Sequence, residues 1–158
     1  LALLRFPYFD FAGDVQRGEL IVAATEANAL LQVFQALYEA QFPFERIELV
    51  HNYGGDDDAS MAANNTSAFN CRAVTGGTSL SSHSYGTAID INPVQNPYVR
   101  DATVLPEAGR AYTDRNDVRP GMIVRPGIVV QAFANAGWEW GGDFGTLKDY
   151  QHFSADGR

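Results

Sequence analysis

Apolar residues recur at helical spacing in two stretches of the chain. The first begins at Thr25, a good N-cap residue, runs to about Ala40 and is stopped by Pro43. Its apolar positions are Ala29, Leu30, Val33, Phe34 and Leu37. The second begins at Pro126 and ends at Gly137. Residues three or four positions apart share one face of a helix, so the pattern predicts an amphipathic helix over each stretch.

Shorter segments alternate between apolar and polar residues, as strands do when one face is buried. We predict strands over residues 19–23, 46–52, 68–74, 86–92 and 150–154, and one helical turn over 60–63. Residues 93–121 hold four prolines and are expected to be an irregular surface excursion that forms part of a cleft wall. Without a βαβ rhythm, the order of elements predicts one small α+β domain over residues 1–158, with a mainly antiparallel sheet and flanking helices.

Composition narrows the class of partner. The 158 residues carry a net charge of −8, which argues against a nucleic acid partner, and no apolar run reaches transmembrane length. The acidic run at residues 56–58 is interpreted as a solvated loop. The chain starts at Leu1 rather than Met, so we expect a trimmed domain whose export signal or anchor lies outside the sequence, and we expect a monomer.

A histidine and an aspartate lie in one short segment, residues 81–92. Ile89 and Ile91 would point to one face of the predicted strand, and Ala88 and Asp90 to the other, so the carboxylate would stand above small residues. His83 precedes this strand in a loop. A buried carboxylate needs a partner, and a metal ion is one candidate, while an ion pair with Arg72 is another.

A second histidine, His152, follows Asp149 near the end of the chain. We hypothesise that His83, Asp90 and His152 bind one Zn²⁺ ion, leaving the fourth position open as in catalytic zinc sites. Asp149 would be the general base, with Glu139 and Asp143 as rivals. Residues three apart lie on opposite faces of a strand, so this assignment requires the backbone to turn near residues 148–149.

Three further side chains have more than one reading. Arg72 could hold a substrate carboxylate or a developing oxyanion, or it could form a surface ion pair. Alternation would point Cys71 to the core and Arg72 away from it, so Cys71 is interpreted as a small buried residue and not as a nucleophile. Trp140 could pack in the core or line a pocket beside the metal.

These motifs resemble the zinc D-alanyl-D-alanine carboxypeptidase family of VanY-type peptidoglycan peptidases. The family signature Ser-x-His-x-x-Gly-x-Ala-x-Asp is met from Ser81 to Asp90, and an acid followed three residues later by His-Phe is met at Asp149 and His152. The resemblance runs from about residue 18 to 153. It implies the fold shared with the hedgehog signalling domain, with His83, Asp90 and His152 as zinc ligands, Asp149 as acid/base, and Arg72 and Ser81 in contact with substrate.

The resemblance implies a zinc peptidase that hydrolyses peptidoglycan stem peptides outside the cytoplasm. It leaves open whether the enzyme is a carboxypeptidase, a dipeptidase or an endopeptidase, and several members carry Glu where this chain has Asp149. Two alternatives remain: a zinc-binding module without catalysis, and a non-haem Fe(II) oxygenase, whose facial triad also uses two His and one carboxylate. Oxygenases of that kind commonly place the first His and the acid nearly adjacent, whereas six residues separate His83 from Asp90.

Overall fold

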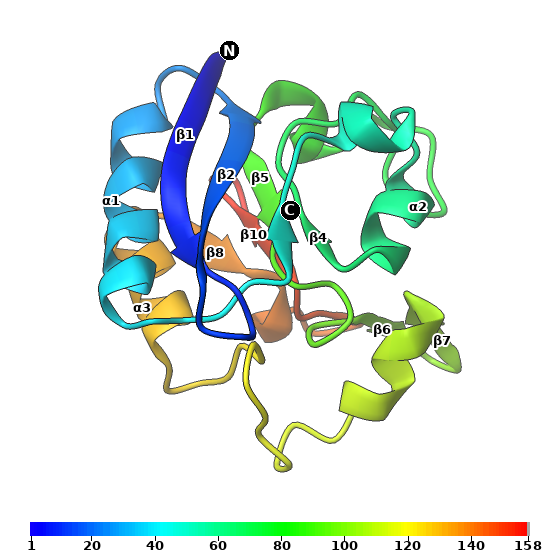
Figure 1. Cartoon of the computed structure of the whole chain (residues 1–158). Helices are drawn as coiled ribbons and strands as arrows, with labels where there is room; N and C mark the ends of the chain where they lie inside the picture. The colour runs from blue at the N-terminus through cyan, green and yellow to red at the C-terminus, as the bar shows by residue number, and fades with distance from the viewer. Residues whose placement is uncertain (158) are drawn as a thin grey trace.

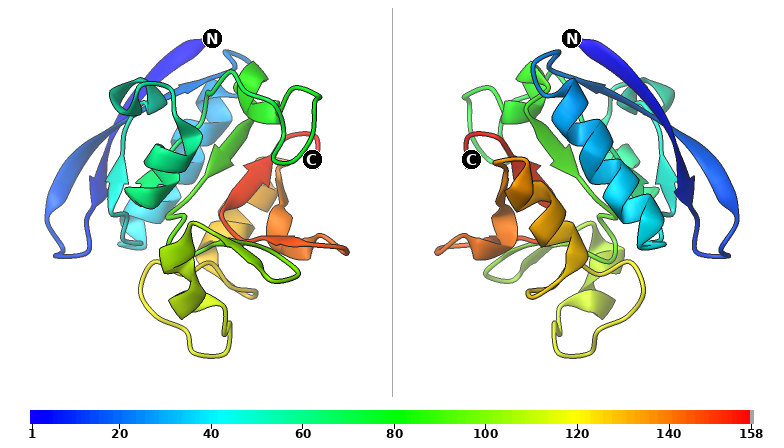
Figure 2. Two further views of the ribbon diagram at one scale, coloured as in Figure 1. Left: turned by 90° about the vertical axis from the view of Figure 1, so that its right-hand side faces the viewer. Right: turned by 90° about the vertical axis from the view of Figure 1, so that its left-hand side faces the viewer.

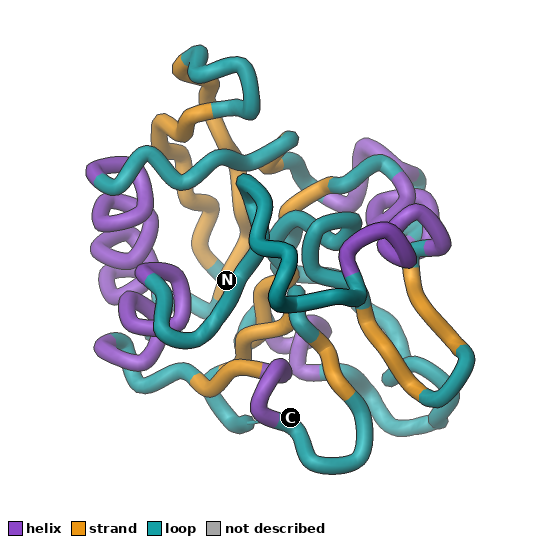
Figure 3. The backbone as a smooth tube through the Cα atoms, turned by 90° about the horizontal axis from the view of Figure 1, so that it is seen from below, coloured by secondary structure: helices purple, strands orange, loops and turns teal. Residues whose placement is uncertain are grey.

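The computed structural model describes residues 1–157, which fold into short helices and small sheets. The helices α1 (Ala27–Glu39) and α3 (Ile128–Asn135) lie together on one side of the molecule, and α2 (Asp57–Ala62) lies on the opposite side (Figure 1). Several of the strands lie between them, and others lie at the edge of the molecule, as the tube in Figure 3 shows. The architecture is α+β, as predicted.

Four small sheets make up the strand content of residues 1–157. Three of them are antiparallel. The first is a hairpin of β1 (Ala2–Phe9) and β2 (Val15–Val22). The second has the order β5-β10-β8 and consists of β5 (Ala88–Asp90), β10 (His152–Ser154) and β8 (Glu139–Trp140). The third has the order β7-β6-β9 and consists of β7 (Thr103–Leu105), β6 (Tyr98–Arg100) and β9 (Lys148–Asp149). The fourth pairs β3 (Arg46–Ile47) with β4 (Asn65–Thr66) in parallel. Figure 2 shows the β1–β2 hairpin on one flank, and β5 beside β10 at the centre.

The core lies between the helices α1 and α3, the β1–β2 hairpin and the β5-β10-β8 sheet. The apolar stripe of α1 is buried at Leu30, Val33, Phe34 and Leu37, which confirms the helix predicted there. Phe133 of α3 stacks on Phe153 of β10 with ring centroids 4.1 Å apart. Both rings are fully buried. None of the helices in residues 1–157 is both long and apolar enough to span a bilayer.

The N-terminal strand was not predicted. In β1 the buried residues Leu4, Phe6 and Tyr8 alternate with exposed ones, but the exposed set includes Leu3 and Pro7. Because apolar residues occupy both faces, the period of two is blurred in the sequence. The predicted strand at residues 19–23 is the second half of β2, and the turn residues before it close the hairpin.

Two predicted strands are wrong over most of their length. Residues 46–52 contain only the two-residue β3, followed by a 3₁₀ turn, η1 (Val50–Tyr53). Residues 68–74 form no regular strand, and their alternation is inverted: Asn70 is buried and Cys71 is exposed. The N–H of Asn70 donates to the carbonyl of His83 (3.2 Å) and that of Arg72 donates to Ser84 Oγ (3.0 Å). This segment is therefore fastened to the loop that carries His83.

Part of the expected irregular excursion is regular. Within residues 93–121 the strands β6 and β7 form a hairpin, followed by a 3₁₀ segment, η3 (Glu107–Tyr112). Tyr98 of β6 lies directly opposite Asp149 of β9. The excursion thus supplies the neighbouring strand for the candidate base.

The loop that carries His83 is a 3₁₀ turn, η2 (Ser82–Tyr85), closed at both ends. Ser81 Oγ accepts a hydrogen bond from the N–H of His83 (3.3 Å). Gly86 follows with φ of +71°, a conformation that disfavours residues with a side chain. A Cβ added to Gly86 would lie 2.6 Å from the backbone nitrogen of Ala23, so this position also lacks room.

Replacing Gly86 by Ala should therefore destabilise the protein more than the same change at Gly54. Both glycines have positive φ, but nothing lies within 4 Å of a Cβ at Gly54. Strain at φ > 0 costs roughly 1–2 kcal/mol at either site, and steric overlap should add about 1–3 kcal/mol at Gly86. Urea unfolding of Gly86→Ala and Gly54→Ala measures the difference. Equal losses of unfolding free energy would contradict the steric role of Gly86.

Candidate active site

The pairing of β5 with β10 brings two of the predicted site residues face to face. His152 lies directly opposite Asp90, and Phe153 lies opposite Ile89. Because side chains alternate along a strand, His152 and Asp90 share one face while Ile89 and Phe153 enter the core on the other. His152 Nδ1 is 3.0 Å from Asp90 Oδ1. Both residues are buried.

The third residue, His83, reaches the same point from η2. Its Nε2 is 3.1 Å from Asp90 Oδ2, and its ring is 2% exposed. Its other nitrogen, Nδ1, lies 2.6 Å from the carbonyl oxygen of Ala68, to which it must donate a proton. Nδ1 is committed to this carbonyl, so Nε2 is the ring nitrogen that faces the carboxylate.

This arrangement suits a cation. The nearest ligand atoms of His83, Asp90 and His152 all lie within 4.8 Å of one another. His83 Nε2 is shielded from solvent and has no hydrogen bond from any of the residues described, although it faces a carboxylate oxygen. Two electron-rich atoms held against each other are unfavourable unless a proton or a metal ion lies between them. The donor set of two imidazoles and one carboxylate therefore fits one divalent metal ion.

The charge state of Asp90 is consistent with a metal-binding site. Burial opposes its ionisation, but the two neighbouring imidazoles outweigh burial and hold the pKa of this carboxyl well below its usual range. Asp90 is thus a carboxylate at neutral pH, the form that binds a metal ion.

Asp149 occupies the position expected of a proton acceptor. It ends β9, and a turn at Tyr150 and Gln151 leads to His152, so the backbone turns where the assignment required it. Burial raises the pKa of Asp149 to about 6, against the lowering effect of His152. Its Oδ1 is shielded from solvent and accepts no hydrogen bond from residues 1–157.

The two rival carboxylates lie elsewhere. Asp143 is exposed and forms an ion pair with Arg125 at 2.6 Å. Glu139 is exposed on β8, with its carboxylate close to Gly157. Neither lines the cavity that contains Asp149.

Arg72 lies beside the three-residue cluster. Its Nη2 is 4.0 Å from Asp90 Oδ2, and its Nε forms an ion pair with Asp57 Oδ2 at 2.9 Å. Asn70 Nδ2 donates to Asp57 Oδ1 (3.1 Å). The ion pair of Arg72 is therefore made chiefly with Asp57. Sequence reasoning missed Asp57 and placed it in a solvated loop, because nothing in an acidic run shows which member faces inward.

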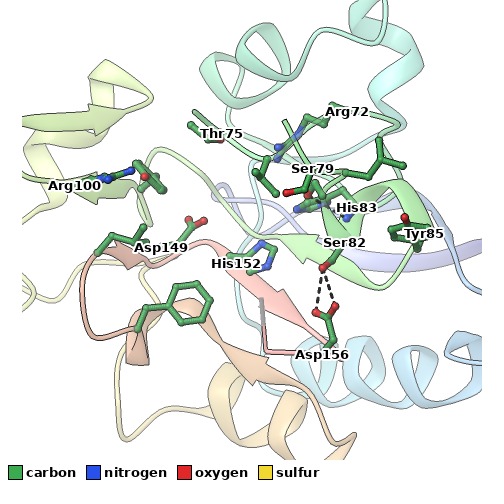
Figure 4. Close-up of a pocket in the computed structure, with 16 residues that line it drawn as sticks. Arg72, Thr75, Ser79, Ser82, His83, Tyr85, Arg100, Asp149, His152 and Asp156 are labelled. Carbon is green, nitrogen blue, oxygen red and sulfur yellow. Dashed lines mark hydrogen bonds between the residues drawn. The ribbon is translucent and has the colours of Figure 1, made fainter. Parts of the chain in front are cut away.

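These residues open onto one cavity of about 520 Å³. His83, His152, Asp149 and Arg72 all line it, and Figure 4 shows them converging from separate elements. Tyr98, Arg100, Phe144 and Leu147 extend the wall on the side of Asp149. Tyr98 lies opposite Asp149, and Arg100 follows two positions later on the same face of β6, so a second guanidinium borders the cavity.

The two other predicted substrate contacts, Ser81 and Trp140, differ in their position relative to the cavity. Ser81 lines the cavity, where its Oγ also caps η2. Trp140 does not line it, which favours the core reading over the pocket reading. Its ring packs in the core near Phe153, and its Nε1 donates to the carbonyl of Tyr150 (2.9 Å). The next residue, Gly141, has no room for a side chain, because a Cβ there would lie 2.5 Å from the carbonyl oxygen of Asp149. The Trp-Gly-Gly segment thus packs against the backbone of residues 149 and 150, on the core side of the site.

Comparison with known proteins agrees with this geometry. A family model described as D-alanyl-D-alanine carboxypeptidase matches residues 75–155, half of the chain. The match contains His83, Asp90, Asp149 and His152. No curated protein and no solved structure gave a match. On the family match, the chain belongs to the D-alanyl-D-alanine carboxypeptidase family of metallopeptidases.

Proposed function

We propose that the protein is a zinc-dependent peptidase that cleaves peptidoglycan stem peptides. The observation that carries the proposal is the joint placement of a three-donor cluster, a shielded carboxylate and a guanidinium beside one cavity of about 520 Å³. The family match independently supports peptide hydrolysis of the D-alanyl-D-alanine carboxypeptidase type.

His83, Asp90 and His152 would hold the zinc ion, which when bound activates water and polarises a carbonyl. Three protein ligands leave room for a reactant, as a catalytic site requires. A side chain that closed the site would have to come from the residues nearby, and the one cysteine of the chain, Cys71, is exposed and does not line the cavity. This favours a catalytic centre over a closed structural one.

Asp149 would accept the proton of the attacking water and return it to the leaving amine. Among the carboxylates weighed for this role it alone lines the cavity, and none of the described residues donates a hydrogen bond to its Oδ1. Arg72 would stabilise negative charge on the substrate, either a terminal carboxylate or the oxygen of the scissile carbonyl. Ser81 would contact the substrate from the wall of the cavity.

The substrate class implies where the protein works. Peptidoglycan lies outside the cytoplasmic membrane, so we propose an extracytoplasmic location and a monomer that acts on wall peptides. The alternative with the same geometry is a metal-binding module that lacks catalysis. A carboxylate at position 149 that faces the cavity favours the enzyme, because a module that only binds the metal has no use for a base there.

The direct test is to incubate the zinc-loaded protein with muropeptides and to identify the products by mass spectrometry. We expect cleavage that a chelator abolishes and added zinc restores, and the fragment masses will name the bond. Cleavage that persists in chelator would contradict the zinc mechanism. Tight zinc binding without hydrolysis of any stem peptide would favour the non-catalytic module, and iron with oxygen-dependent turnover would favour an oxygenase.

Removing one ligand should remove the metal. We expect His83→Ala to be purified with little or no zinc, because two remaining ligands bind it far more weakly. Elemental analysis after dialysis measures the zinc content per chain. The matched control is His51→Ala, since His51 is exposed and lies outside the cavity, and this variant should keep one zinc per chain. Full zinc occupancy in His83→Ala would contradict the ligand assignment.

Removing the base should leave the metal in place. We expect Asp149→Asn to retain zinc but to lose activity by roughly 10²- to 10⁴-fold, the usual contribution of general acid–base catalysis. The controls are Glu139→Gln and Asp143→Asn, which remove the rival carboxylates and should remain active. An active Asp149→Asn variant, together with an inactive control, would reassign the base. Zinc content and stem-peptide turnover are measured on all three proteins.

A further inference from the structure

Three charged side chains stand in a row at the edge of the candidate metal site. Asp57 Oδ2 is 2.9 Å from Arg72 Nε, and Arg72 Nη2 is 4.0 Å from Asp90 Oδ2. The side chains of Arg72 and Asp57 are only 22% and 20% exposed, and that of Asp90 is 6% exposed. Because solvent screens this row only partly, the guanidinium interacts more strongly with both carboxylates than it would on an exposed surface.

The guanidinium could pair with either carboxylate. Arginine binds carboxylates strongly through two parallel hydrogen bonds, and Asp90 is the more deeply buried of the two partners. A shift toward Asp90 would direct an arginine to an oxygen that already faces His83 Nε2. Asp90 Oδ2 would bind a metal ion less strongly while it accepts hydrogen bonds from a guanidinium. Arg72 is therefore a potential competitor for the metal ligand.

We propose that Asp57 is a positioning residue that holds Arg72 away from Asp90. This leaves Asp90 available to the metal ion and Nη2 of Arg72 available to the substrate. The inference rests on the proposed function, because it assigns the restraint to a metal site that acts on a charged substrate.

Asp57 is itself held in place. It is the first residue of α2, after Asp56, whose side chain accepts the N–H of Ala59 as the N-cap. Asn70 Nδ2 donates a hydrogen bond to Asp57 Oδ1, and Asp57 Oδ2 forms the ion pair with Arg72. Arg72 is further restrained by a hydrogen bond from Nη1 to the carbonyl of Ala73 (3.1 Å). The guanidinium therefore has partners on the side away from the cluster.

The test compares two neighbouring acidic residues of α2. Asp57→Asn and Asp58→Asn remove the same charge one position apart, but Asp58 is exposed and lies outside the cavity. Zinc affinity is measured by competition with a chromogenic chelator, and thermal unfolding checks that both variants are folded. We expect Asp57→Asn to weaken zinc binding about 10-fold or more, the scale of lost outer-shell support, and Asp58→Asn to leave it unchanged.

A double-mutant cycle separates positioning from simple loss of negative charge. If Asp57 acts through Arg72, Asp57→Asn should have little further effect on zinc affinity in an Arg72→Gln background. An equal loss in both backgrounds, or unchanged affinity in Asp57→Asn alone, would overturn the inference while leaving the proposed function intact. Failure of the wild-type protein to bind zinc would contradict both.

Discussion

The antiparallel register of β5 and β10 is the constraint on which the rest of the site depends. It sets His152 opposite Asp90 and, one residue along, sets Phe153 opposite Ile89. A slip by one residue would exchange the two faces, so that a histidine would enter the core and a phenylalanine would meet the carboxylate. The buried stack of Phe153 on Phe133 opposes such a slip, because fully burying one aromatic side chain contributes roughly 1.5–3 kcal/mol. Hydrophobic packing on one face thus holds the polar cluster on the other.

The close contact between His83 and Asp90 needs a proton or a cation between the two side chains. Asp90 and His83 are buried with electron-rich atoms 3.1 Å apart, an arrangement that costs free energy unless a charge of the opposite sign compensates it. The surrounding structure enforces it through the Ala68 carbonyl, the caps of η2 and the sheet register. Preorganisation of this kind lets the folded chain offer three ligands at once, so little ordering remains to be done when a metal ion binds.

The periodic spacing of apolar residues in the sequence predicted the elements that bury one face against the core. The helices followed from apolar spacing, and the strand around Asp90 from alternation, because each buries one face against the core. The partners of Arg72 could not be predicted in the same way. Whether Asp57 or Asp58 faces inward is set by α2, and Cys71 is exposed because its segment pairs with the loop of His83 instead of a strand. Trp140 could equally fill a core or a pocket wall, and only the tertiary structure decides between them.

The candidate site is divided between two regions of the sequence. The family match covers residues 75–155, which supply the three candidate ligands, Asp149 and the hairpin that bears Arg100. Arg72 and its partner Asp57 precede that region, yet the structure places them beside Asp90. The candidate ligands and the candidate base therefore lie in the matched half, while the half outside it contributes a guanidinium beside the candidate metal site. A pattern confined to residues 75–155 would therefore miss this cation, which only the folded chain brings to the site.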